Sequence, residues 1–128
     1  MSAHPITISV ETGYVENQSD PAKQRYVFFY TITIKNVGES DCQLISRHWL
    51  IQHGQGRTEE VYGEGVVGEQ PVITPGGSYT YTSGAVLETE FGSMQGRYFM
   101  IQRDEDGYAK EFEAPIPQFT LCVPRTLH

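Results

Sequence analysis

The sequence has 128 residues, 38% of them apolar, which is the size and composition of one domain with one hydrophobic core. Charged residues make up only 20%, which excludes a disordered or coiled-coil chain. The net charge of −7 opposes binding to nucleic acid and to anionic membrane surfaces. We therefore expect a single domain over residues 1–128 whose partners are neutral or cationic.

The N-terminal segment lacks the basic region and the continuous apolar run of a secretory signal, and no stretch approaches the ~18 apolar residues of a membrane helix. We expect a cytoplasmic protein without a membrane partner. The chain has 2 cysteines, Cys42 and Cys122, which are far apart in the sequence. In a cytoplasmic protein, two such cysteines are expected to be reduced core residues rather than a disulfide.

Residue preferences indicate strands rather than helices. Thr, Val and Ile occur 11, 10 and 9 times against 5 alanines, and glycine or proline interrupts nearly every stretch long enough for a helix. Apolar and polar residues alternate in short runs, as they do in half-buried strands. The predicted strands cover residues 6–10, 28–34, 42–52, 78–83, 97–103, 108–113 and 116–123.

The third predicted strand contains the single tryptophan, Trp49, which we expect to anchor the core with Ile45 and Ile51 on the same side. Residues 104–107, Asp-Glu-Asp-Gly, predict a hairpin turn. The prolines around the last predicted strand suit a sheet edge. In the second strand, the residues expected to share one face are Phe28, Tyr30, Ile32 and Ile34.

About seven short strands, with no helix available to connect parallel neighbours, predict two antiparallel sheets packed face to face. An all-β sandwich of the immunoglobulin or fibronectin type III kind is favoured. A small closed barrel is the alternative, because strand patterns alone do not distinguish the two.

From about Tyr26 to Leu121 the sequence resembles the bacterial ApaG family, most clearly in three runs. They are VYGEGVVGEQP at residues 61–71, TPGGSYTYTSG at 74–84 and GSMQGRYFM at 92–100. The resemblance implies a fibronectin type III-like sandwich in a cytoplasmic protein linked to cobalt resistance and magnesium efflux, with a gene neighbourhood shared with a dinucleoside tetraphosphatase. Similar domains in eukaryotic F-box and polymerase-interacting proteins look like adaptor or ligand-recognition modules. The resemblance thus favours binding over catalysis.

The glycines at Gly63, Gly65 and Gly68 spell GxGxxG, a pattern that lets backbone approach a pyrophosphate when a helix begins next to it. Prolines and glycines follow instead, so no helix begins there and a Rossmann interpretation fails. A weaker hypothesis is a backbone nest that binds a pyrophosphate-containing nucleotide with help from Arg57 and Arg97. The alternative is that the glycines only permit positive φ in a tight loop.

We expect no metal site and no cofactor. His48 and His53 lie at odd separation in a strand and should point to opposite faces, whereas Cys42 and His48 share a face but are six residues apart. The acidic residues at 59–60 and 104–106 lack the spacing of an oxygen cage and are expected to be solvated turns.

No catalytic residues are predicted, and we do not expect an enzyme. The chain has no G-x-S-x-G motif, and Ser78, Ser83 and Ser93 have no histidine nearby in the sequence.

The predicted partner is a protein rather than a nucleic acid. Residues 27–30 and 98–101 are apolar on both faces of their strands, which indicates strands covered on both faces or an exposed binding patch. A partner would then bind through a sheet face or an edge strand. Whether the chain also forms a homodimer is left open.

Overall fold

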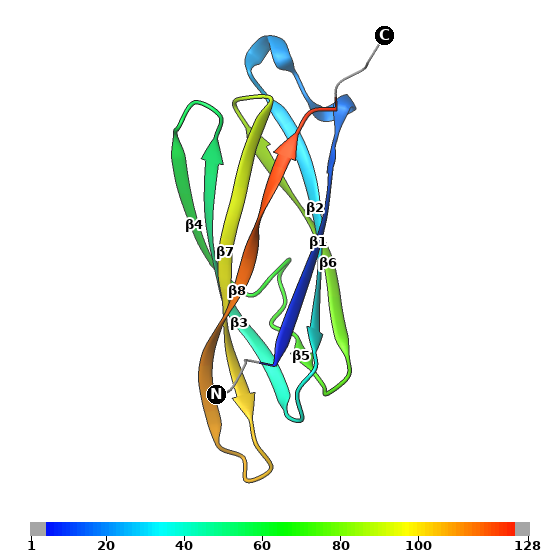
Figure 1. Cartoon of the computed structure of the whole chain (residues 1–128), viewed down its shortest axis with the longest axis vertical. Helices are drawn as coiled ribbons and strands as arrows, with labels where there is room; N and C mark the ends of the chain where they lie inside the picture. The colour runs from blue at the N-terminus through cyan, green and yellow to red at the C-terminus, as the bar shows by residue number, and fades with distance from the viewer. Residues whose placement is uncertain (1–4, 125–128) are drawn as a thin grey trace.

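The computed structural model describes residues 5–124, which form eight strands and two single-turn 3-10 helices (Figure 1). Residues 1–4 of the segment considered above for a secretory signal lie outside this range. Within it, no helix is long and apolar enough to cross a membrane. The elements are β1 (Ile6–Tyr14), η1 (Glu16–Gln18), η2 (Pro21–Lys23), β2 (Tyr26–Asn36), β3 (Asp41–His53), β4 (Thr58–Glu64), β5 (Val72–Ile73), β6 (Ser78–Leu87), β7 (Phe91–Arg103) and β8 (Ala109–Cys122).

The strands form two antiparallel sheets. One has the order β1-β2-β6, and the other has the order β4-β3-β7-β8 with β5 added beside β3. At one side of the sandwich the edge strands β1 and β8 are in contact, while β6 and β4 form the edges at the other side (Figure 1). The predicted sandwich is confirmed, and the sheets do not join into a closed barrel.

Alternation along β2 supplies the first half of the core, as the sequence predicts. Phe28, Tyr30, Ile32 and Ile34 are all buried and point towards the second sheet. From that sheet, Trp49 is 2% exposed, and its ring centroid lies 5.5 Å from that of Tyr30. Trp49 is therefore the core anchor expected from the sequence.

A β-bulge in β3 changes which residues face the core. The register between β3 and β7 shifts between Leu44 and Ser46, so Ile45 is the extra residue. Before the bulge Cys42 and Leu44 face inward. After it, the buried inward residues are Trp49, Ile51 and His53. The prediction that Ile45 shares the side of Trp49 is wrong, because the bulge turns Ile45 to the outer face.

Several boundaries differ from the sequence predictions. The last two predicted strands form one strand, β8, which is indeed an edge strand, and β4 and β5 were not predicted. The hairpin at 104–107 is confirmed, with Gly107 at φ +83°. Both cysteines are free, but only Cys42 is in the core; Cys122 is exposed at the end of β8. Cys122 alternates with the inward-facing Leu121 and so points away from the core.

Candidate functional site

The glycine-rich segment forms a tight β-turn rather than an open loop. The amide of Val66 donates to the carbonyl of Glu69 at 2.8 Å, and the amide of Glu69 donates back at 2.9 Å. The two residues between them, Val67 and Gly68, have φ of +44° and +83°. Two consecutive positive φ values define a type I′ turn, in which glycine is strongly preferred at the second position.

The other two glycines have steric roles. The amide of Gly65 donates to the carbonyl of Ile45 at 2.8 Å, and a Cβ at Gly65 would lie 2.2 Å from the carbonyl oxygen of Glu69. Gly63 lies within β4, opposite Arg47. Three amides of the segment, those of Gly65, Val66 and Glu69, are thus bonded within the protein, which favours the tight-loop alternative over an anion nest.

The two arginines predicted to assist this segment lie elsewhere. Arg57 is in the turn before β4, at the far end of that strand, about 20 Å away along the backbone. It pairs with Glu88 at 3.0 Å. Arg97 is on the outer face of β7, where it lies 3.4 Å from Glu113 and over the ring of Phe99.

Arg47, which sequence reasoning missed, is the arginine beside the glycine turn. Its Nη1 donates to the carbonyl oxygens of Glu64 and Gly65 at 3.2 and 2.7 Å. The guanidinium fills the place of a side chain at Gly63, where a Cβ would lie 2.7 Å from Cζ. The bulge at Ile45 puts Arg47 on the inward side together with Trp49. Without the bulge, strict alternation from Cys42 would put Arg47 on the outer face.

Arg47 borders a cavity of about 350 Å³ between the sheets, on the side where β4 and β6 are the edges. Burial raises the pKa of the tyrosines Tyr30, Tyr81 and Tyr98 in this region, so all three hydroxyls stay protonated at neutral pH. The hydroxyls of Tyr81 and Tyr98 are hydrogen-bonded to each other. The cavity lining consists of Tyr30, Arg47, Trp49, Ile51, Val61, Glu64, Val66, Val67, Gly68, Tyr81, Ser83, Gly84 and Met94.

The two histidines considered as metal ligands each lie beside a glutamate side chain. The ring of His53 is buried, with Nε2 2.9 Å from Oε1 of Glu59 and Nδ1 accepting the amide of Glu88. His48 is on the outer face, with Nε2 3.4 Å from Oε2 of Glu60, too poorly aligned for a hydrogen bond. Because of the bulge, Cys42 faces inward and does not share the face of His48, contrary to expectation. Among residues 5–124, no three His, Cys, Asp or Glu side chains are grouped to hold a metal ion.

The serines considered as nucleophiles are not paired with these histidines. Ser93 Oγ donates to Oε1 of Gln52 at 3.0 Å and accepts from Nε2 of Gln118 at 3.1 Å. Ser83 borders the inter-sheet cavity, and Ser78 pairs with Lys35 at the first residue of β6. Among the described residues, neither ring is hydrogen-bonded to a serine.

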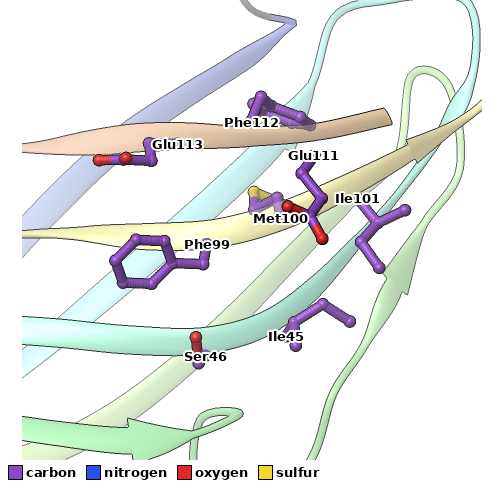
Figure 2. A pocket seen from close by; sticks show the side chains of 8 residues that line it. All are labelled: Ile45, Ser46, Phe99, Met100, Ile101, Glu111, Phe112 and Glu113. Atoms are coloured by element: carbon purple, nitrogen blue, oxygen red, sulfur yellow. The ribbon is translucent and has the colours of Figure 1, made fainter. Parts of the chain in front are cut away.

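The outer face of the five-stranded sheet carries an uncovered apolar groove (Figure 2). Tyr98 and Met100 are buried in the core, whereas Phe99 and Ile101 alternate with them on the outer side of β7 and are only half-buried. The bulge adds Ile45 to the same surface. We define the outer-face groove as the depression of about 580 Å³ lined by Ile45, Ser46, Phe99, Met100, Ile101, Glu111, Phe112 and Glu113.

The other strand predicted to be apolar on both faces, β2, also leaves an aromatic side chain exposed. In β2, Val27 is 8% exposed and Phe29 is 38% exposed. The Phe29 ring fills the space beside Gly13, where a Cβ would lie within 2.1 Å of it. Phe29 is thus more exposed than Phe99 or Ile101, but the open groove lies over β7.

Known proteins resemble this chain over nearly its full length. Residues 16–102 match the family model described as the ApaG domain. The chain is 48% identical over 128 residues to Protein ApaG of Pectobacterium atrosepticum, covering 100% of this chain and 99% of that protein. It is 54% identical over 125 residues to Protein ApaG of Pseudomonas aeruginosa, covering 98% and 96%.

Solved structures agree with these matches. A crystal structure of a Bordetella pertussis protein that carries the name ApaA has a TM-score of 0.87 at 47% identity, covering 98% of this chain and 100% of that one. The C-terminal domain of wzt has a TM-score of 0.51 at 10% identity, covering 99% and 78%, which is a likeness of fold alone. The family model and the full-length relatives together show that this chain belongs to the ApaG family.

Proposed function

We propose that this ApaG-family chain is a non-enzymatic recognition domain of the cytoplasm that binds a protein partner through the outer-face groove. The observation that carries the proposal is that β7 is apolar on both sides, with Phe99 and Ile101 only half-buried on the outer side beside the bulge residue Ile45. A contiguous apolar surface rimmed by polar groups is typical of protein interaction sites.

The charges around the groove indicate the kind of partner. Glu111 and Glu113 border it, and only Glu113 has a basic neighbour at ion-pair distance among the described residues, namely Arg97 at 3.4 Å. The net charge of the chain is −7. We expect an apolar segment that carries lysine or arginine, because such charges are complementary to the glutamates at the rim.

A substitution in the groove tests the proposal. Phe99→Asp places a carboxylate among the apolar residues, and the matched control Val86→Asp does so on the outer face of the other sheet, where Val86 is 43% exposed. Partners are cross-linked in cells and quantified, and their affinities are then measured with purified proteins. We expect Phe99→Asp to lose about tenfold or more in affinity while Val86→Asp keeps it. Equal binding by all three proteins contradicts the proposal.

The link to cobalt resistance and magnesium efflux would act through this partner rather than through a metal bound by the chain. Its test is complementation of a strain that lacks the gene. We expect Val86→Asp to restore cobalt tolerance and Phe99→Asp to fail. Full tolerance with Phe99→Asp separates the metal phenotype from the groove.

A second candidate is the binding of a pyrophosphate-containing nucleotide by the Gly63–Gly68 segment. In its favour, the positive charge of Arg47 lies beside the turn. Against it, the amides of Gly65 and Val66 are already bonded within the protein. The test is a thermal-shift titration with pyrophosphate, ATP and diadenosine tetraphosphate, in which a hundredfold excess over the Kd adds about 2.7 kcal/mol of stability. Absence of a shift with all three removes this candidate.

A further inference from the structure

We propose that the cavity between the two sheets is a binding site for a small organic anion, with the Arg47 guanidinium as its charged anchor and the Trp49 indole N–H as a second donor. The cavity lies on the opposite side of β3 from the outer-face groove, so this inference does not depend on the proposed function.

The charge of Arg47 is not neutralised by the described part of the chain. Within residues 5–124 no carboxylate forms an ion pair with it, and its contacts are the carbonyl oxygens of Glu64 and Gly65. These carbonyls engage Nη1 only. Glu64 also lines the cavity, but no oxygen of its carboxylate lies within ion-pair distance of the Arg47 guanidinium. A partly buried guanidinium with free donors is a strong site for an anion, because charge-assisted hydrogen bonds are the stronger kind.

The indole of Trp49 supplies an independent sign of a missing ligand. Trp49 is 2% exposed, and its Nε1 has no hydrogen-bond partner within the described residues. Buried tryptophan N–H groups nearly always have one. Trp49 itself lines the cavity, together with Val61, its register partner on β4.

The walls and size of the cavity define the class of ligand. Ile51, Val61, Val66 and Met94 give it apolar walls, and its volume of about 350 Å³ is at the small end of known ligand pockets. A compact apolar or aromatic body with one carboxylate or phosphate group fits this setting. A dinucleoside polyphosphate is too large for it.

The single tryptophan makes the test direct, because its indole N–H gives one NMR cross-peak that reports on the cavity alone. The probes are benzoate and phenyl phosphate, with benzamide as the neutral analogue of benzoate. We expect a saturable shift of the indole cross-peak with at least one anion. Benzamide should bind at least about tenfold more weakly than benzoate. No saturable shift with either anion up to about 10 mM means a cavity that holds only water, and it overturns the proposal.

Substitutions assign the effect to the cavity. Arg47→Gln removes the anchor and should weaken anion binding by about tenfold or more, whereas Arg57→Gln, an equal loss of charge in an exposed ion pair, should not. Because Arg47 also holds the glycine turn, Ser83→Leu offers a second variant that narrows the cavity and leaves the contacts of Arg47 intact. Wild-type affinity in either Arg47→Gln or Ser83→Leu overturns the proposal.

Discussion

The steric role of the glycine turn can be measured by comparing alanine substitutions at three of the glycines with positive φ. Gly65 has φ of +64°, and a Cβ there would lie 2.2 Å from the carbonyl oxygen of Glu69. Gly68 and Gly56 have φ of +83° and +87°, and nothing lies within 4 Å of a Cβ at either position. All three variants therefore place a non-glycine residue at positive φ, and only Gly65→Ala adds a collision with fixed backbone.

The magnitudes follow from these two terms. A non-glycine residue at positive φ costs roughly 1 kcal/mol, and the collision in Gly65→Ala adds about 1–3 kcal/mol. In a domain of this size 1 kcal/mol lowers Tm by about 3–6 °C. We expect Gly68→Ala and Gly56→Ala to melt about 3–6 °C lower than wild type, and Gly65→Ala about 10 °C lower or more.

Thermal denaturation followed by circular dichroism measures the three values. Gly56 is in a different turn and serves as the control for strain alone. A Gly65→Ala protein that melts with the other two would refute the reasoning, because it would show that the segment does not pack against Glu69.

The remaining predictions concern buried hydroxyls and thiols. Tyr98→Phe leaves the buried Tyr81 hydroxyl without its partner and should lower the free energy of unfolding by about 1–3 kcal/mol in urea titrations. Addition of Tyr81→Phe removes the unpaired hydroxyl and should restore part of the lost stability. Because burial raises the pKa of both tyrosines above the ordinary value of 10.0, the unfolded chain loses their protons first. The contribution of these two tyrosines to stability should be constant below pH 10 and then fall by about 1.4 kcal/mol per pH unit for each of them. The fall above pH 10 should therefore be shallower in Tyr98→Phe, and an equally steep fall contradicts this account. Burial also raises the pKa of Cys42, so a thiol reagent should modify the exposed Cys122 at once and Cys42 only on unfolding; equal rates would contradict the burial.

Alternation predicted the core where the strands are regular and failed where they are not. The four inward residues of β2 were correct because that strand pairs with β1 and β6 without a break in register. In β3 the bulge at Ile45 inverts the alternation, which no local pattern reveals, since Ile45 is as apolar as its neighbours. The strand β4 was missed because Val61 is the one aliphatic residue in it, which leaves no apolar alternation to read. Most of the core residues on this side belong to its partner strand β3.

The candidate sites depend on the same irregularity. The glycine segment contains no arginine, so which arginine lies beside it depends on the fold. The signal that could have identified Arg47 is its spacing of two from Trp49, since residues two apart in a strand share a face. The outer-face groove was partly predicted, because the alternation of residues 98–101 leaves one apolar side of β7 without a place in a single core.

Deletion of Ile45 tests whether the bulge organises both surfaces. Without this residue β3 can pair regularly with β7, and Leu44 and Trp49 both keep their inward positions, so the core should be retained. The Ile45 carbonyl accepts the amide of Gly65 and Nε2 of Gln70 at 2.8 and 2.9 Å, and loss of both bonds should cost about 1–3 kcal/mol. The deletion also removes an apolar residue of the groove, so partner affinity should fall while the fluorescence of Trp49 stays that of a buried indole. A shift to the emission of an exposed indole would mean that β3 has slipped in register instead, and that the bulge is needed to fix the pairing itself.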